Sequence, residues 1–438
     1  MPPLKAPLEG TIFKLDSSGV AGFFGGDEAV SAMATVHIYE GRKWLGWYNS
    51  PGSYTVAKRY GRLARARLWN ALFPGVHVDP ATLFGLSGGT GPEFVATYSG
   101  TKIADTGHIG YLFLKKCQSL STTNIEGRVT SSLSVTISDL ERVPELQTNT
   151  AAPRGLSYTL LAVFPILSSV GACVVCGVYQ DWYCSSMILL GILCSGISCF
   201  VIGSGVLRFT HPNPAKVSPK GDGYLHATSE LIVLRGEEGA VNSVTRGRFS
   251  LKFSGEPEYR AIGISAMLLT AQFLLQLLLI PQGTLFGQIM FLSTLAISWA
   301  YNCYLSSLDR EMIQAEILMK KVLGNPVMTR YRLGTRTAAV VFLALALRPP
   351  DPGKVLEGLL PDTATWKIWK RVVGEKVKKE EGMMFDESDY DGVVHEEREM
   401  LKVLFSDATE AYRGYLASKA HVDEGNGRTT GSESKLEL

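Results

Sequence analysis

Charge is absent from one long stretch of the sequence, and this absence organises the rest of the chain. Residues 261–308, about 48 in a row, contain no Asp, Glu, Lys, Arg or His. This is roughly twice the length that one α-helix needs to cross a ~30 Å hydrocarbon core. The turn-forming sequence Pro281-Gln282-Gly283 divides the stretch. We therefore predict two transmembrane helices, at residues 261–280 and 284–307.

A second region is almost as poor in charge. Between residues 155 and 207 the only charged side chain is Asp181, which separates two uncharged halves. Tyr179, Trp182 and Tyr183 cluster at this point, as aromatic residues do at a membrane interface. We predict transmembrane helices at residues 155–180 and 182–207. The chain is thus expected to carry four transmembrane helices, arranged as two tight hairpins.

Ionisable side chains are missing from the interiors of all four predicted spans. Proton-coupled pumps and membrane enzymes with histidine boxes need such groups at depth, so both classes are disfavoured. The main polar residues are Gln272 and Gln276 on one face of a predicted span, with Gln288 and Asn302 across the hairpin. Such amides either line a pore or make intramembrane contacts between helices, and the second use is the commoner one.

The sequence also lacks secretory features. The first 16 residues have no apolar core of a signal peptide, so membrane entry is expected to rely on the internal spans. No N-x-[ST] sequon occurs. Six of the seven cysteines lie in or beside apolar spans, which indicates packing rather than a disulfide framework. Cys173-x-x-Cys176 is likewise interpreted as packing, and we predict no metal and no cofactor.

Excess charge of one sign is absent too, since the net charge is only +2, and we predict no nucleic-acid partner. Basic residues are nevertheless concentrated in residues 57–73, a predicted helix with apolar and aromatic residues between them. A helix of this kind lies on an anionic lipid surface, or it packs its apolar side into its own domain with a solvated basic face. The candidate lipid contacts are Lys58, Arg59, Arg62, Arg65 and Arg67.

Small side chains recur every fourth residue in the second predicted span. They put a narrow stripe on one face, which lets two helices approach closely. We predict a helix-packing seam made of Gly191, Ser195, Cys199 and Gly203.

The remaining segments are expected to be soluble. We predict an α/β (α+β) domain over residues 1–150, with strands at 35–39, 94–98, 110–115 and 132–137. Residues 208–260 are a polar αβ connection, with strands at 231–234 and 249–253, expected to pack with that domain. Residues 309–420 form a helical region in which 338–347 is a buried core helix or, if it crosses the membrane, a short fifth span. Residues 421–438 are a polar tail expected to be disordered.

Catalytic motifs are weak throughout these soluble segments. The glycine-rich residues 85–91 lack the Lys-Ser/Thr of a phosphate-binding P-loop, and Asp105 and His108 have no nucleophile motif beside them. The acidic residues 387–392 approach a calcium loop, but its twelfth position is Arg398 in place of the bidentate Glu. We predict no catalytic residue.

These patterns together predict a multi-pass α-helical membrane protein with an N-terminal soluble domain and a helical C-terminal region. Basic residues flank the spans on one side, which places the termini in the cytosol by the positive-inside rule. We expect a non-enzymatic scaffold or binding platform, whose partners are the lipid bilayer and a second copy or a cytosolic protein. The alternatives are a membrane-anchored enzyme using residues 1–150, and a passive channel or transporter formed by oligomerised spans.

Overall fold

The computed structural model describes residues 7–8, 24–75, 78–150, 156–253, 255–390 and 395–429. The chain forms two compact units, each assembled from three separate stretches. The helical unit comprises Met1–Gly88, Gln147–Thr210 and Phe249–Ile317, and the sheet unit comprises Gly89–Leu146, His211–Arg248 and Leu318–Leu438. This division differs from the predicted one, because residues 1–150 are shared between the two units.

Four long helices form the frame of the helical unit: α6 (Leu156–Val178), α7 (Trp182–Ile202), α9 (Arg260–Leu279) and α10 (Leu285–Ser306). Among the described residues, three helical stretches are long and apolar enough to cross a membrane, namely Thr159–Val178, Trp182–Ile202 and Arg260–Gln282. The helix α10 is equally long and uncharged but does not reach their hydropathy. The prediction of apolar spans is therefore confirmed for three of the four helices.

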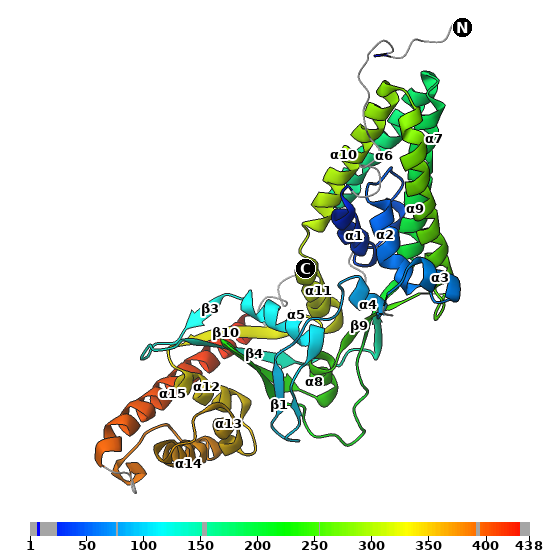
Figure 1. The fold of residues 1–438 in the computed structure, drawn as a ribbon. Helices are drawn as coiled ribbons and strands as arrows, with labels where there is room; N and C mark the ends of the chain where they lie inside the picture. The colour runs from blue at the N-terminus through cyan, green and yellow to red at the C-terminus, as the bar shows by residue number, and fades with distance from the viewer. Residues whose placement is uncertain are drawn as a thin grey trace, which may run out of the picture. The chain divides into compact units, whose positions relative to one another are not determined.

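Short helices from the N-terminal part of the chain pack among the long ones. The α7 helix packs on both α6 and α9, and α10 packs on α6. Helix α1 (Gly26–Ala34) lies against α10, helix α2 (Ser53–Tyr60) lies against α9, and the two short helices also pack on each other. Figure 1 shows α1 and α2, in blue, beside the long green helices. Residues 24–60 thus belong to the helical unit rather than to a separate soluble domain.

The other elements of the helical unit are short. The predicted single helix at residues 57–73 is broken into α2, the 3₁₀ turn η3 (Gly61–Leu63) and α3 (Arg67–Leu72). A small sheet has the strand order β5-β6-β9. The remaining bounds are η1 (Thr35–His37), η2 (Arg42–Trp44), α4 (Pro80–Leu83), β5 (Gln147–Asn149), β6 (Val206–Thr210), β9 (Arg248–Lys252), η4 (Ile280–Gln282) and α11 (Arg310–Ile317).

The sheet unit is built on seven strands in the order β2-β1-β7-β8-β4-β10-β3. The central pair β4–β8 is parallel, β10 pairs antiparallel with β4, and β3 adds in parallel to β10 at one edge. The strand bounds are β1 (Glu93–Ala96), β2 (Lys102–Ile103), β3 (Thr122–Asn124), β4 (Leu133–Leu140), β7 (Gly223–Ala227), β8 (Glu230–Gly236) and β10 (Val327–Leu333).

Alternation along the strands decides which side of this sheet is apolar. Leu133, Val135 and Ile137 of β4 point into the main core with α12, while Thr136 points to the opposite side. The helices of the unit are α5 (Gly107–Gln118), α8 (Glu238–Thr245), the π-helix η5 (Leu318–Val322), α12 (Arg336–Leu347), α13 (Pro352–Leu359), α14 (Ala364–Lys378), the turn η6 (Glu387–Tyr390) and α15 (His395–Thr429).

Helix α12 is the centre of the sheet unit's core. Every residue from Thr337 to Leu347 is buried, and α12 contacts the sheet, α13 and α15. Of the two alternatives predicted for residues 338–347, the buried core helix is therefore confirmed, and the short fifth span is not. The predicted tail falls partly in α15, which continues to Thr429, while residues 430–438 lie outside the described residues.

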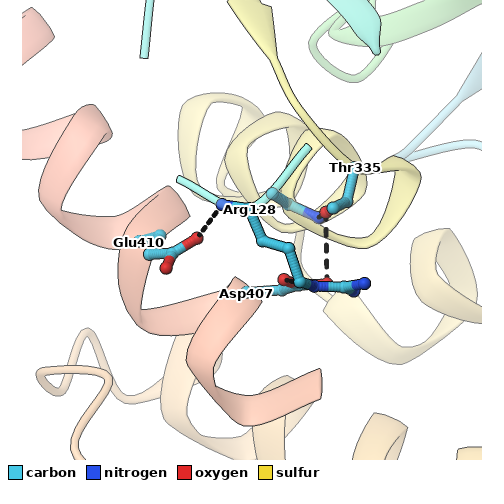
Figure 2. Close-up of polar contacts among 5 residues, drawn as sticks. Arg128, Thr335, Asp407 and Glu410 are labelled. Atoms are coloured by element: carbon cyan, nitrogen blue, oxygen red, sulfur yellow. Dashed lines mark hydrogen bonds and ion pairs between the residues drawn. The ribbon is translucent and has the colours of Figure 1, made fainter. Parts of the chain in front are cut away.

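One polar cluster fixes α15 to this core (Figure 2). Asp407 of α15 is 1 % exposed and accepts hydrogen bonds from the Arg128 guanidinium at 2.6 and 3.1 Å. It also accepts one from the Thr335 hydroxyl at 3.2 Å, and Thr335 itself caps α12. Glu410, one turn further on, accepts a bond from the backbone amide of Arg128 at 3.0 Å. The loop that carries Arg128 and the start of α12 are thereby tied to one face of α15.

Candidate membrane-domain site

Residues 42–50, which we call the inserted segment, run along the C-terminal half of α7. Lys43 lies beside Gly203, Gly46 beside Cys199, and Asn49 beside Gly191. The rise from Gly191 to Gly203 corresponds to about 18 Å of helix. Most of the segment is not helical, and such backbone is tolerated at membrane depth only where protein buries it. The inserted segment meets that condition because the long helices surround it.

The predicted small-residue seam is the surface that receives this segment. A Cβ atom added to Gly191 would collide with the Asn49 side chain, one on Gly203 with Lys43, and one on Gly46 with Cys199. The fourth member, Ser195, approaches Gly46 through its carbonyl oxygen. The stripe therefore brings a loop close to α7, whereas the prediction was close approach of two helices.

Asn49 connects all four long helices. It is completely buried, and its side-chain amide donates to the hydroxyl of Thr294 on α10 at 3.0 Å. Its carbonyl accepts from Gln276 on α9 at 3.3 Å, and its backbone amide donates to Ser169 on α6 at 3.0 Å. Contact with Gly191 adds α7. The side chain and the backbone of Asn49 thus provide hydrogen-bond partners for polar groups on three helices in a nonpolar interior.

The glutamines singled out in the sequence take part in this network. Gln276 donates to the Met187 carbonyl at 3.1 Å as well as to Asn49, and Gln272 donates to Gln276 at 3.3 Å. Gln288 instead donates to the carbonyl oxygens of Pro281 and Gly283, where it closes the turn between α9 and α10. Gln272 and Gln276 are therefore joined, and Gln288 is separate from them.

A second polar link ties the two hairpin turns together. Asp181 is 4 % exposed and caps α7 by accepting from the Cys184 amide. Its other oxygen accepts from the backbone amide and the hydroxyl of Thr284, the capping residue of α10, at 2.8 and 2.6 Å. The one charged residue between the first two spans therefore joins the starts of α7 and α10.

A small cavity lies between the inserted segment and helices α1, α2, α7, α9 and α10. Arg42 on its wall is 2 % exposed and has no ion pair with a carboxylate among the residues that the structure describes. The guanidinium bonds to the Tyr48 hydroxyl, lies 5.5 Å from the Tyr301 ring centroid and approaches the Cys199 sulfur at 3.9 Å. All of these neighbours are neutral groups, so the positive charge is uncompensated.

The basic residues of the broken helix lie on the surface. Lys58, Arg59, Arg65 and Arg67 are exposed, and we call these four the basic face. Arg62 differs because it is half-buried and its stem packs beside Gly75. Leu68 and Leu72 of α3 are exposed by 58 % and 49 %, whereas Trp69 is buried against Gly263 near the start of α9. Basic and apolar side chains therefore share one exposed surface near the first turn of α9.

Asp105 and His108 both accept hydrogen bonds from backbone amides of the glycine-rich stretch. Asp105 accepts from the backbone amides of Gly91 and Gly107, both at 2.7 Å, and His108 Nδ1 accepts from the Gly89 amide at 3.3 Å. Both side chains therefore hold the glycine-rich loop in place. In the acidic stretch, Glu387 pairs with Arg398 and Asp389 with Lys376. Asp391 and Gly392 of the predicted calcium-like loop lie outside the described residues.

His37 occupies an apolar site in the helical unit. Its ring is 4.3 Å from that of Phe84 and 5.8 Å from that of Phe253, measured between centroids. Nδ1 lies 3.2 Å from the Gly205 carbonyl, so Nδ1 carries the hydrogen and donates it. Burial lowers the pKa of His37 to about 4, opposed by this hydrogen bond. The imidazole is therefore neutral at physiological pH.

The inserted segment was not among the residues that the sequence singled out. Its sequence, RKWLGWYNS, begins with two basic residues and is typical of soluble chain. The one signal that points to a membrane is its aromatic content, because Trp44, Trp47 and Tyr48 lie within five residues. Trp44 is 54 % exposed and its ring lies 4.8 Å from that of Phe200. These two rings mark one end of α7.

Neither a metal-binding cluster nor a disulfide bond occurs among the described residues. No group of three His, Cys, Asp or Glu side chains there could hold a metal ion. All seven cysteines are free thiols, and those in the long helices are used in packing. No protein-family model, curated protein or solved structure matches this chain.

Proposed function

We propose that the chain is an integral membrane protein whose helical unit crosses the bilayer. The observation that carries this proposal is the outward face of the long helices, where large apolar side chains are exposed. On α7 these are Leu189, Leu193 and Ile197, at 48 %, 43 % and 38 % exposure, one turn apart. Soluble monomers rarely expose apolar patches of this extent.

Aromatic residues limit this apolar surface at both ends. Trp182 and Tyr183 are exposed at the start of α7, and Phe200 packs with Trp44 near its end. The interval from Trp182 to Phe200 is about 27 Å of helix, close to the ~30 Å thickness of a hydrocarbon core. Aromatic belts are common at both membrane interfaces. This spacing supports a transmembrane orientation of α7.

We infer that α10 is the fourth span despite its lower hydropathy. Its polar residues Gln288, Thr294 and Asn302 are buried, while Ile289 and Ile297 are exposed. The low average therefore reflects side chains that face the interior of the unit rather than lipid. Four spans return residues 208–260 and the C-terminal part to the side of the N-terminus, which the flanking basic residues assign to the cytosol.

Protease protection in sealed vesicles tests this threading, with tags at both termini and within residues 208–260. We expect all three tags to be cleaved from the cytosolic side. Protection of the C-terminal tag alone would mean that α10 does not cross, and the four-span proposal would be wrong.

We further propose that the protein is non-enzymatic and serves as a binding platform anchored on anionic lipid. The basic face supports this, because its four charges lie in one segment of the chain, residues 58–72, with the exposed Leu68 and Leu72. Leucine side chains enter the interface while each basic group near headgroups contributes about 1 kcal/mol. Gln276 is hydrogen-bonded to the Met187 carbonyl, which favours a structural role over a place in a pore lining. Asp105 and His108 accept hydrogen bonds from backbone amides, which favours a structural role for them as well.

Lipid retention measured by native mass spectrometry tests the basic face. The quadruple variant K58Q/R59Q/R65Q/R67Q should retain at least tenfold less phosphatidylglycerol than the wild type, with phosphatidylcholine unchanged. The matched control K354Q/R371Q/K378Q/K379Q removes four exposed charges from the sheet unit and should retain the wild-type amount. Equal losses in both variants would contradict a specific lipid surface.

A further inference from the structure

The positive charge of the buried Arg42 is not balanced by a negatively charged neighbour among the described residues. A buried cation is costly unless a carboxylate or another anion compensates it, and a guanidinium does not lose its proton in a protein. Tyr48, Tyr301 and Cys199 are neutral neighbours. The Asp and Glu side chains that the structure describes form no ion pair with Arg42. The residues that the structure describes therefore do not supply a compensating anion.

The cavity beside Arg42 has the polar groups to hold such an anion. Three buried polar atoms have no hydrogen-bond partner and belong to residues of its wall: Arg42 Nε, Ser53 Oγ and Gln272 Oε1. Their residues come from η2, α2 and α9, and are 2 %, 3 % and 1 % exposed. An unpaired polar atom of this kind costs roughly 1–3 kcal/mol, so these three atoms need partners that the described residues do not supply.

The direction of the hydrogen bonds fixes what Gln272 presents. The Met187 carbonyl accepts only, so the Gln276 atom facing it is the nitrogen, and the Gln276 oxygen remains as an acceptor. The Gln272 atom that bonds to this oxygen at 3.3 Å must then be its nitrogen. The unpaired Gln272 atom is therefore the carbonyl oxygen, which needs a donor. The cavity thus combines a cation, a hydroxyl and an acceptor.

We propose that this cavity binds a small oxyanion that carries its own hydroxyl, of which hydrogencarbonate is the smallest and dihydrogen phosphate a larger example. The anionic oxygens accept from Arg42 Nε and the Ser53 hydroxyl, while the ligand's own hydroxyl donates to Gln272 Oε1. A halide satisfies the first two groups and leaves the third unpaired. The cavity of about 20 Å³ holds about one water molecule, so its wall must widen for any ion of this class, and least for hydrogencarbonate.

The cavity lies toward one end of α7. Arg42 contacts Cys199, which is three residues from the last residue of α7, or about 5 Å of helix. This proposal does not depend on the lipid surface, because none of the residues of the basic face lines the cavity.

Thermal unfolding of the full chain in detergent tests the proposal, at about pH 7.5 and constant ionic strength. The probes are potassium hydrogencarbonate, potassium phosphate and potassium chloride. We expect hydrogencarbonate to raise the melting temperature saturably, and chloride to do so more weakly. Isotope-edited infrared spectra with ¹³C-hydrogencarbonate should show a bound band in the wild type. If phosphate is as effective as hydrogencarbonate, the class stands and the size argument is wrong.

Variants of the wall separate the site from a general salt effect. Arg42→Gln should abolish the response, and Ser53→Ala should weaken apparent affinity roughly tenfold, the loss expected for one hydrogen bond to a charged group. Gln272→Met should remove the preference for hydrogencarbonate over chloride. The control Lys58→Gln, on the exposed side of α2, should respond as the wild type does.

Three results would overturn the proposal. The first is equal stabilisation by all three salts in the wild type. The second is a wild-type response in Arg42→Gln or, if that variant does not fold, in both Ser53→Ala and Gln272→Met. The third is the absence of a bound infrared band and of any salt response, which would assign the cavity to water alone.

Discussion

At the scale of single residues, the interior of the helical unit depends on amides that each satisfy several partners. Asn49 bonds to Thr294, Gln276 and Ser169, and all of these groups are buried. Because these groups are buried, a bond that is lost would not be replaced by one to water. Removing the Asn49 side chain therefore affects α9 and α10 at once, while the bond from its backbone amide to Ser169 on α6 remains.

Replacing Asn49 with Ala should destabilise the helical unit by about 1–3 kcal/mol, because the Thr294 hydroxyl and the Gln276 amide each lose a buried partner. The measurement is thermal unfolding in detergent. Asn70→Ala is the control, since Asn70 is exposed on α3, and its effect should stay within about 0.5 kcal/mol. Similar shifts in both variants would contradict the role assigned to Asn49.

His37 should make the stability of the helical unit depend on pH. Its pKa is about 4 in the folded protein and about 6.5 in the unfolded chain, so the unfolded chain binds more protons between these values. Stability is therefore fully present above pH 6.5, falls as the pH drops from 6.5 toward 4, and loses about 3 kcal/mol in total.

The comparison is between wild type and His37→Gln, which does not titrate. Unfolding is followed from about pH 7 to pH 5.5, above the range in which most carboxylates protonate. The variant should lose less stability over this range than the wild type by about 1 kcal/mol. An identical pH slope in the two proteins would show that the buried imidazole is not responsible.

At the scale of elements, the sequence predicted periodicities correctly and partners incorrectly. The four-residue spacing from Gly191 to Gly203 indicated one small-residue face of α7, and the structure has that face. The segment that packs on this face could not be predicted. The inserted segment carries Arg42 and Lys43, so its sequence resembles that of a solvent-exposed loop, and only the packing of the long helices around it makes it part of the interior. Tertiary packing overrides local composition there.

A matched pair of glycines tests this face. A Cβ on Gly191 would collide with Asn49, whereas one on Gly171, in α6, would meet nothing within 4 Å. Gly191→Ala should therefore destabilise the unit by about 1–3 kcal/mol through overpacking. Gly171→Ala should be neutral or stabilising by up to about 1 kcal/mol, because Ala is the better helix former. Thermal unfolding of both variants checks this, and equal effects would contradict a seam on α7.

The incorrect secondary-structure predictions have a common physical cause. Residues 110–115 were expected as a strand and belong to helix α5, in which Ile109, Leu112 and Phe113 are buried at helical spacing. Residues 35–39 were also expected as a strand and begin with a 3₁₀ turn. A short apolar run does not distinguish strand from helix. Predictions at 94–98, 132–137, 231–234 and 249–253 were confirmed, and three of these four runs are rich in β-branched or aromatic residues.

At the scale of the whole molecule, the candidate site could be predicted only in part. Absence of charge identified the long helices, because both the outward-facing and the buried positions in them are uncharged. The cavity at Arg42 could not be found this way, since it gathers residues from α1 to α10 that are far apart in the sequence, such as Ala29 and Asn302. The two-unit division is equally hidden, because each unit is assembled from three separate stretches of chain.

Separate cores should make the two units unfold as separate transitions. The core around α12 belongs to the sheet unit, and the cluster around Ile188 and Phe291 belongs to the helical unit. Asp407→Asn should lower only the transition of the sheet unit, by about 2 kcal/mol, because it weakens charge-assisted bonds to Arg128. Asn49→Ala should lower only that of the helical unit. Asp351→Asn, in the exposed ion pair with Lys354, is the control for Asp407 and should change little.

Cysteine reactivity provides the readout, because the sheet unit contains one cysteine, Cys117, and the helical unit contains the other six. Cys117 is fully buried, and burial raises the pKa of its thiol, so it reacts only when the sheet unit opens. Alkylation during a temperature ramp, with labelled peptides located by mass spectrometry, follows each unit separately. Asp407→Asn should advance labelling of Cys117 alone, and Asn49→Ala should advance that of the buried Cys176 and Cys184 alone. If either variant advanced all three cysteines together, the two units would be one cooperative structure, and the division between them would have no thermodynamic meaning.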